Sequence, residues 1–280
     1  MFKLLNANFS RLKHSKMLYV IIIITVIIAL FFIFNHFKVQ LKVGSENMTY
    51  DMDKMMLNYI NIIGLFMAMF TSLFIGTEYD YGTIRNKIIV GHSRTSIYFS
   101  NLIVSIVVGI LLEFIYMLIV IGIGVPLLAK LNLSFSQYII IFLETILVIS
   151  AYSSFFTLIS FAFSNVTFST TACMLLLLGM YIISANLAYP INMPKNITES
   201  YYDDQGIEHV VKAMPNPNYP SKQKMFIYKN IYYSIPTGQA SEISGKLNKV
   251  DTFNLVKYSL GFICTTNIIG IYIFKKKDLK

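Results

Sequence analysis

Residues 78–94 read EYDYGTIRNKIIVGHSR and form a short charged island between two long apolar stretches. A globular protein has little reason to place glutamate, arginine and lysine beside a Gly-Thr-Ile turn between hydrophobic spans. A membrane protein that binds a partner in the cytoplasm does have a reason for this arrangement. The apolar stretches on either side stay in lipid, while the charged island reaches water. The island therefore predicts a membrane-spanning fold with a handle on one face.

Composition supports the same class. The chain has 280 residues, of which 55% are hydrophobic and 13% charged, well under the roughly 25% charged share of soluble domains. The net charge of +9 does not predict a nucleic-acid partner, because cationic flanks on apolar helices are ordinary topology signals. Both cysteines, Cys173 and Cys264, fall in apolar runs, so neither a disulfide framework nor a metal site is predicted.

Hydropathy predicts six transmembrane helices and an all-α polytopic fold, since lipid cannot hydrogen-bond a bare backbone. The third span exceeds one bilayer crossing, and Gly122, Gly124 and Pro126 near its end predict a bend or an unwound turn. The expected spans are Met17–Phe34, Tyr59–Gly76, Ile97–Leu128, Tyr138–Phe163, Phe168–Tyr189 and Leu255–Phe274.

Basic residues set the expected orientation. They gather before the first span, between the second and third, and after the sixth, and six crossings put these three segments on one side. The positive-inside rule makes that side cytoplasmic, and both termini are therefore expected in the cytoplasm. The composition, rich in Ile, Asn and Lys, indicates a bacterial protein, so the membrane is expected to be a bacterial cell membrane. The residues are Lys3, Arg11, Lys13, Lys16, Arg85, Lys87, Arg94, Lys275, Lys276, Lys277 and Lys280.

The N-terminal residues 1–16 predict an amphipathic helix that lies in the membrane interface and contacts lipids. Phe2, Leu5, Phe9 and Leu12 recur at intervals of three and four, with polar residues between them. A frayed basic lead-in to the first span is the alternative.

Residues 190–252 are the predicted extracellular segment, between spans 1–5 (17–189) and the last span with its basic tail (253–280). Their prolines exclude one long helix. We expect a small external cap or substrate-gating element, with a disordered insertion as the alternative. Residues 239–250 predict a short amphipathic helix that leads back into the bilayer.

Two turns are expected to bound a short helix within the island. Thr83 is expected to cap this helix, and Gly91 to end it. Thr95 or Ser96 is expected to cap the next span.

The faces of that helix suggest its use. Ile84 and Ile88 share one face, while Arg85 and Lys87 are displayed elsewhere. A helix parallel to the membrane with an apolar ridge and exposed cations is a handle that a cytoplasmic partner can push. The alternative is a solvated loop whose arginines only anchor lipid headgroups.

Two carboxylates, Glu113 and Glu144, fall within the third and fourth spans. Polar residues at that depth usually face protein or water, because a charge costs about 2.5–3.5 kcal/mol on insertion scales. They line a substrate path or a gate between subunits in one interpretation. In the other, they are protonated or hydrogen-bonded packing contacts.

The sequence shows no motif for ATP hydrolysis or other catalysis. A P-loop is absent, because Gly245-Lys246 is followed by Leu247 where serine or threonine is required. The four histidines are scattered without metal spacing, and no G-x-S-x-G elbow occurs. The chain is therefore expected to be no enzyme and to bind no cofactor directly.

The order of elements resembles the membrane permease subunits of ABC-2-type (type V exporter-like) ATP-binding-cassette transporters. In those subunits an amphipathic interface helix precedes the first span, and a Glu-x-x-x-Gly-Thr-x-Arg segment follows the second. This chain reads EYDYGTIR over residues 78–85. Its GHSR over residues 91–94 lacks the proline of the Pro-x-Ser-Arg-like turn that is common in the family.

The resemblance implies that the island is the coupling helix, docked in a groove of a separate ATPase subunit that carries ATP and Mg. Ile84 and Ile88 would fill the groove, Arg85 and Lys87 would pair with acidic groups of the ATPase, and Glu78 would anchor the second span. The implied coupling residues are Glu78, Tyr79, Gly82, Thr83, Ile84, Arg85, Lys87, Ile88 and Arg94.

The resemblance also implies a second permease copy, or a related permease, and export of a peptide such as an antimicrobial peptide, an antibiotic or a lipid-like substrate. Two other functions remain. An ion-coupled secondary transporter would need internal repeats, which the sequence lacks, and its own coupling pair, for which Glu113 with Glu144 is the candidate. A membrane sensor or assembly protein would place its specificity in residues 190–252.

Overall fold

The computed structural model describes residues 1–43, 52–202, 208–246 and 250–278, so the predicted tail residue Lys280 lies outside the described residues. The described elements are α1 (Phe2–Lys13), α2 (Lys16–Val43), α3 (Met52–Leu57), α4 (Ile60–Asp80), α5 (Thr83–Ile89), α6 (Arg94–Ile119), the π-helix η2 (Val120–Gly124), α7 (Val125–Leu127), α8 (Phe135–Ala162), α9 (Val166–Ile191), β1 (Asn196–Tyr202), β2 (Glu208–Pro215), α10 (Lys222–Ser234), α11 (Pro236–Lys246) and α12 (Thr252–Lys276).

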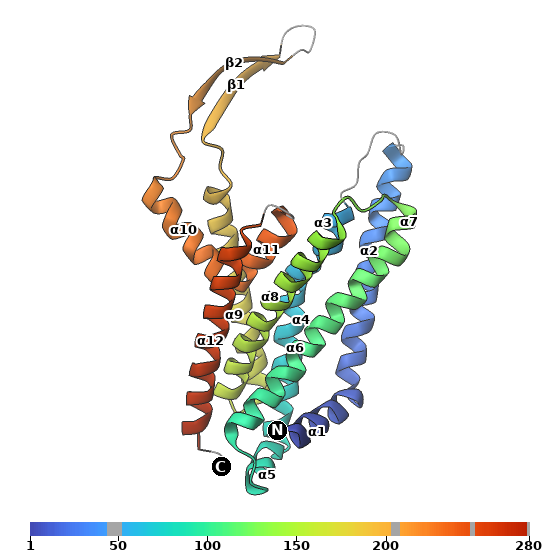
Figure 1. Ribbon diagram of the computed structural model, residues 1–280, viewed down its shortest axis with the longest axis vertical. Helices are drawn as coiled ribbons and strands as arrows, with labels where there is room; N and C mark the ends of the chain where they lie inside the picture. The colour runs from blue at the N-terminus through green and yellow to red at the C-terminus, as the bar shows by residue number, and fades with distance from the viewer. Residues whose placement is uncertain (44–51, 203–207, 247–249, 279–280) are drawn as a thin grey trace.

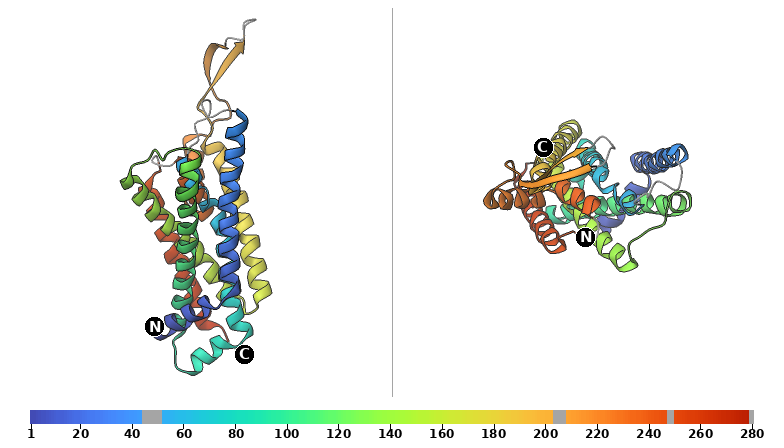
Figure 2. Two further views of the ribbon diagram at one scale, coloured as in Figure 1. Left: turned by 90° about the vertical axis from the view of Figure 1, so that its right-hand side faces the viewer. Right: turned by 90° about the horizontal axis from the view of Figure 1, so that it is seen from above.

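The long helices form an elongated bundle with different structures at its two ends (Figure 1). The antiparallel hairpin of β1 and β2 projects from one end, which we call the hairpin end. The short helices α1 and α5 lie at the other end, near the end of α12, and we call this the α5 end (Figure 2). The basic groups used to predict the orientation, before the first span, between the second and third, and after the sixth, therefore meet at one end within the described residues.

Six described helical stretches are long and apolar enough to cross a membrane, which confirms the all-α polytopic fold. The first two spans differ most from their predicted bounds, and the other four differ by three residues or fewer at each end. The first span continues past Phe34 to Val43, because its more polar last turns stay helical beyond the apolar run. The second begins with the separate short helix α3, and the chain turns between Leu57 and Ile60.

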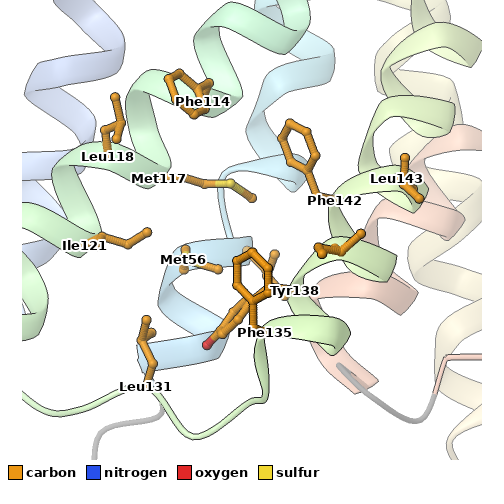
Figure 3. Close-up of a pocket in the computed structure, with 12 residues that line it drawn as sticks. Met56, Phe114, Met117, Leu118, Ile121, Leu131, Phe135, Tyr138, Phe142 and Leu143 are labelled. Carbon is orange, nitrogen blue, oxygen red and sulfur yellow. The ribbon is translucent and has the colours of Figure 1, made fainter.

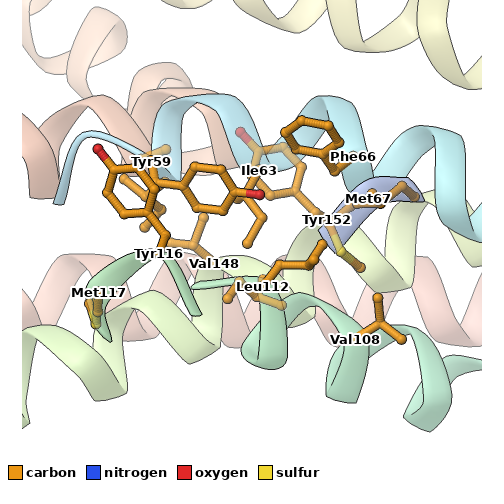
Figure 4. Packing of buried hydrophobic residues seen from close by; sticks show 14 of the residues in the cluster. Tyr59, Ile63, Phe66, Met67, Val108, Leu112, Tyr116, Met117, Val148 and Tyr152 are labelled. Atoms are coloured by element: carbon orange, nitrogen blue, oxygen red, sulfur yellow. The ribbon is translucent and has the colours of Figure 1, made fainter. Parts of the chain in front are cut away.

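The centre of the bundle is formed by α4 and α8. The most apolar window is 67% buried in the crossing that contains α4 and 56% in α8, but only 17% in α9. Helices in lipid associate through small residues that allow close approach. Gly109 of α6 does this: a Cβ atom there would lie 2.5 Å from Ile149 Cγ2 and 2.9 Å from Met67 Sδ. Figure 4 shows this core, with Met67 and Leu112 between the helices.

The predicted irregularity in the third span is confirmed as a wider helical turn. Residues Val120–Gly124 form the π-helical turn η2, and the chain continues directly into α7. Pro126 lies in α7, two residues after the end of this wider turn.

The hairpin end carries a folded segment, which excludes a disordered insertion for its described residues. β1 and β2 pair in antiparallel fashion, with an irregularity between Glu199 and Ser200. These strands were not predicted from the sequence. β-branched residues in both, such as Ile197 and Val210, were the available signal.

Helix α11 covers residues 239–246 of the short helix predicted at 239–250, and it lies buried against α4, α8 and α9. Its buried polar groups are paired: Gln239 Nε2 donates to the Tyr233 carbonyl at 2.6 Å, and Ser259 Oγ donates to Gln239 Oε1 at 2.8 Å. Tyr233 also donates through its hydroxyl to Glu242 Oε1 at 2.8 Å. A polar helix can sit inside the bundle because these bonds replace water.

Candidate functional site

Helix α5 begins at a sharp turn after α4. Gly82 has a φ of +64°, in the left-handed region that glycine adopts without the steric cost of a Cβ atom. The predicted cap by Thr83 is wrong, because the Thr83 hydroxyl donates backward to the Glu78 carbonyl at 3.0 Å. The turn therefore fixes α5 across the end of α4.

The turn after α5 agrees with one prediction and corrects another. Gly91, with a φ of +93°, follows the last residues of the helix, which confirms it as the stop. The next span is capped by Ser93, whose Oγ accepts from the Ser96 backbone N–H at 3.2 Å. The prediction that Thr95 or Ser96 would be the cap is therefore wrong by two or three residues.

The predicted apolar ridge of α5 faces the protein itself. Ile84 is 1% exposed and packs in a cluster with Leu4, Ile75 and Ile97, and the half-buried Ile88 packs against that cluster. A seven-residue helix depends on such packing, since it is too short to be stable alone. Ile84 is therefore not available to fill a groove of a partner.

The opposite side of α5 is exposed and partly apolar. Tyr81, Ile89 and Val90 are 79%, 72% and 76% exposed. Arg85 and Asn86 are exposed beside them. Arg85 lies one helical turn before Ile89, and Asn86 one turn before Val90. We call this surface the α5 face; its residues are Tyr81, Arg85, Asn86, Ile89 and Val90.

Beneath α5, the carboxylate of Glu78 collects two cations. Glu78 is 1% exposed, Arg11 Nη1 lies 2.5 Å from its Oε1, and Lys87 Nζ binds the same oxygen. Its other oxygen accepts from Asn101 Nδ2 at 3.2 Å. The Arg11 guanidinium also stacks over the Phe74 ring, 3.6 Å from the centroid. Both carboxylate oxygens are therefore satisfied inside the protein.

Lys87 is part of this cluster and is not displayed to solvent as predicted. Its side chain is 16% exposed, and its Nζ also donates to Asn8 Oδ1 at 3.0 Å. Asn8 in turn donates to Ser100 Oγ at 3.1 Å. Burial lowers the pKa of Lys87, while the Glu78 carboxylate opposes that shift.

These contacts, which we call the Glu78 cluster (Asn8, Arg11, Glu78, Lys87 and Asn101), join four helices. They bring together α1, α4, α5 and the first turns of α6. Removing one partner of a buried ion pair is strongly destabilising, because the other charge stays buried without compensation. The cluster therefore holds α5 to α1, α4 and α6.

A second set of contacts lies around Arg94. Its Nη1 donates to the carbonyl oxygens of Phe274 at 2.6 Å, Lys275 at 2.9 Å and Lys277 at 2.6 Å. These carbonyls belong to the end of α12, where a helix has no internal donors for them and a cation is favourable. Arg94 therefore ties α6 to the end of the last span.

Lys277 extends these contacts to α8. Its Nζ donates to the carbonyls of Phe161 and Ala162 at 2.8 and 2.9 Å, and it lies over the Tyr79 ring at 4.7 Å. Burial lowers the pKa of Lys277 to about 8. The Tyr79 hydroxyl donates to the Phe161 carbonyl at 3.2 Å. Tyr79 and Arg94, predicted as coupling residues, thus hold helix ends together.

We expect Arg94→Gln to lower the thermal unfolding midpoint of the detergent-solubilised protein by several degrees. Hydrogen bonds from charged groups contribute about 1.5–3 kcal/mol, and the substitution removes the guanidinium whose Nη1, with two N–H groups, is shared by three carbonyls. Circular dichroism at 222 nm measures the effect. Arg85→Gln, an exposed arginine at the same end, is the matched control and should melt like the wild type. Equal midpoints for both variants would contradict the assigned role of Arg94.

Sequence reasoning missed several partners in these contacts. Asn8 and Asn101 were not named, and Arg11 and Lys277 were named only as topology signals. The carboxylate of Glu78 at the end of an apolar span needs a cation beside it if it is buried. This was the signal in the sequence that a basic residue such as Arg11 would lie next to it. The pairing itself depends on how α1 packs against α6, which the local sequence does not show.

The face of α1 that packs on the bundle also differs from the predicted apolar stripe. Leu4, Asn8 and Leu12 are its buried residues, whereas Phe2 is 84% exposed. The predicted residue Phe2 thus lies on the outside of α1, where contact with the membrane interface stays a prediction, whereas Phe9 is partly buried against the core.

Glu113 and Glu144 are both buried within the bundle, 0% and 2% exposed. Neither oxygen of Glu113 has a hydrogen-bond partner among the described residues. The aromatic rings of Tyr59 and Tyr116, shown in Figure 4, stack at 4.6 Å nearby. Neither carboxylate lines any of the three described pockets, and their role in a substrate path stays a prediction.

Two comparisons with known proteins bear on this site. A family model described as ABC-2 family transporter protein matches residues 4–182, which is more than half of the chain. The matched part contains α1, the island, the Glu78 cluster and most of α9. A search of curated proteins gave no match.

Proposed function

The chain belongs to the ABC-2 family of transporter proteins and is an ABC transporter permease subunit, and from this premise we propose that an ATPase subunit drives it through the α5 face. The ATPase would carry the ATP and Mg and dock on Tyr81, Arg85, Asn86, Ile89 and Val90. Movement of α5 would then shift the spans between two arrangements.

The observation that carries this proposal is the two-sided character of α5. One side is locked to the protein by Ile84 and by the ion pair of Lys87 with Glu78. The other side presents Ile89 and Val90 to the surroundings, more than 70% exposed. A surface that receives force needs both an exposed contact and a rigid mount. The α5 face has the first, and the Glu78 cluster supplies the second.

We place the α5 end in the cytoplasm and the hairpin end outside. The support is the charge distribution, because the exposed lysines of α1 and of the end of α12 gather at the α5 end. The membrane would be the bacterial cell membrane. Residues 190–252 are then extracellular.

A second permease copy, identical or related, would complete the path. The support is that the interior of one chain is filled: Tyr59, Tyr116 and Tyr152 are fully buried at its centre. The cargo we propose, an exported peptide, antibiotic or lipid-like compound, rests on the family membership alone.

An ion-coupled carrier is the second candidate, and one observation favours it. Glu113 is a fully buried carboxylic acid without a hydrogen-bond partner among the described residues. Such groups within spans are often proton or ion sites. Uphill transport that persists without ATP and stops in Glu113→Gln would favour the carrier.

Co-purification tests the proposal directly. The chain is isolated in mild detergent from its own host, and an ABC ATPase in equal amount is the expected companion. Arg85→Glu should lower the amount of ATPase recovered, while Lys13→Glu, an exposed cation of α1 at the same end, should not. Uphill cargo movement by a preparation that lacks any ATPase would contradict the proposal.

A further inference from the structure

An apolar groove opens between α6 and α8 toward the hairpin end. Its cavity volume is about 410 Å³. Figure 3 shows side chains of α6 on one side, those of α8 on the other, and Met56 of α3 at the end. The lining residues are Met56, Leu57, Phe114, Met117, Leu118, Ile121, Leu131, Phe135, Tyr138, Ile139, Phe142 and Leu143.

The groove opens sideways, toward the bilayer. Leu118 and Ile121 on its α6 side, and Ile139 and Leu143 on its α8 side, are between 45% and 56% exposed. These residues lie within stretches apolar enough to cross the membrane. The open side of the groove therefore lies along the apolar flank of the bundle, which the bilayer would cover.

Water does not suit this space. The only polar side chain among the lining residues is Tyr138, and its hydroxyl binds the buried carboxylate of Asp53. Apolar cavities without two or more polar partners stay dry. If the groove were empty, the side chains that line it would lose dispersion contacts on that side.

A second copy of the chain does not suit it either. Helices in lipid pack through glycine, alanine and serine, which let backbones approach. The groove is lined by large side chains throughout, with no small residue among them. A flexible hydrocarbon chain fills such an irregular slot better than a rigid helix does.

The hairpin end of the groove carries a positive charge. Lys130 directly precedes the lining residue Leu131, is exposed, and has no acidic partner among the described residues. The nearby carboxylate of Asp53 is 2% exposed and accepts from the Asn132 backbone N–H at 3.1 Å. The accessible charge at this depth is therefore cationic, which complements a phosphate.

We propose that the groove between α6 and α8 is a binding site for an anionic membrane phospholipid. One acyl chain lies in the groove against Met117, and the phosphate lies beside Lys130. The site goes beyond the proposed coupling function, because it involves no residue of the α5 face or of the Glu78 cluster.

The chain contains no tryptophan, so single tryptophans report on lipid contact without background. The full-length variants are reconstituted in vesicles that contain phosphatidylglycerol or phosphatidylcholine with brominated acyl chains, which quench tryptophan. Met117→Trp places the reporter in the groove at a residue only 9% exposed. Leu175→Trp, at a 63% exposed position of α9, reports bulk lipid, and Phe156→Trp, at a 0% exposed position, reports the core.

We expect brominated phosphatidylglycerol to quench Met117→Trp nearly as strongly as Leu175→Trp, with Phe156→Trp unquenched. Its preference over phosphatidylcholine at Met117→Trp should be about fivefold, as expected for one cation near anionic lipid. Lys130→Glu in the same background should remove that preference.

Three results would overturn the proposal. A Met117→Trp signal as protected as that of Phe156→Trp would show that protein, including a second copy, fills the groove. Equal quenching by the two lipids would show only general contact with the bilayer. A preference that persists in Lys130→Glu would place the headgroup elsewhere.

Discussion

Ile89→Asp should reduce the ATPase that co-purifies with the chain by at least about tenfold, the change that corresponds to 1.4 kcal/mol. Ile89 is 72% exposed at the centre of the α5 face. An aspartate there would lose its hydration in any interface that covers it, without a partner designed for it. ATP-driven export should fall with the loss of the ATPase.

The permease itself should remain folded in this variant, because Ile89 contributes little to the bundle. Phe253→Asp is the matched control, since Phe253 is an exposed apolar residue (77%) at the opposite end of the molecule. It should leave ATPase recovery unchanged. Equal recovery in both variants would mean that the partner does not use the α5 face.

Glu78→Gln should abolish coupled transport and also lower the stability of the protein. The substitution leaves Arg11 and Lys87 facing each other at low exposure without the carboxylate that holds them. Breaking a buried pair in this way costs about 3–5 kcal/mol. We expect a clear drop in the unfolding midpoint and, where the protein still folds, ATP hydrolysis that no longer produces export.

Asp80→Asn is the control for this prediction, because Asp80 is an exposed acid two residues later in α4. It should melt and transport like the wild type. Retention of full export in Glu78→Gln would show that the Glu78 cluster does not transmit force, even if the surface of α5 binds an ATPase.

The spans and the island were predictable because each has a strong local signal. Runs of apolar residues specify helices in lipid, and a glycine at position 82 specifies a turn that other residues adopt at a cost. The irregular turn near Pro126 followed from the same kind of signal.

The faces of α5 were not predictable, because the helix carries two apolar ridges. Ile84 and Ile88 form one, while Ile89 and Val90 form part of the other. Which ridge packs inward depends on the angle set by Gly82 and on the position of α1, and both are tertiary facts. The ridge that was predicted to contact the partner is for that reason the inward one.

The charges of the island illustrate the same limit. Arg85 and Lys87 look equivalent in the sequence, yet one is exposed and the other binds Glu78. The difference arises because α1 brings Asn8 and Arg11 to the Glu78 side of α5. Contacts between residues more than sixty positions apart produce no periodic pattern in the sequence from which they could be predicted.

A photoreactive amino acid at position 89 tests the central claim most directly, in cells that contain the complete transporter. If the α5 face receives the ATPase, irradiation should give one adduct with the summed mass of the chain and the ATPase subunit. The same amino acid at position 253 should give none. Export-competent protein that yields no ATPase adduct from position 89 would contradict the account.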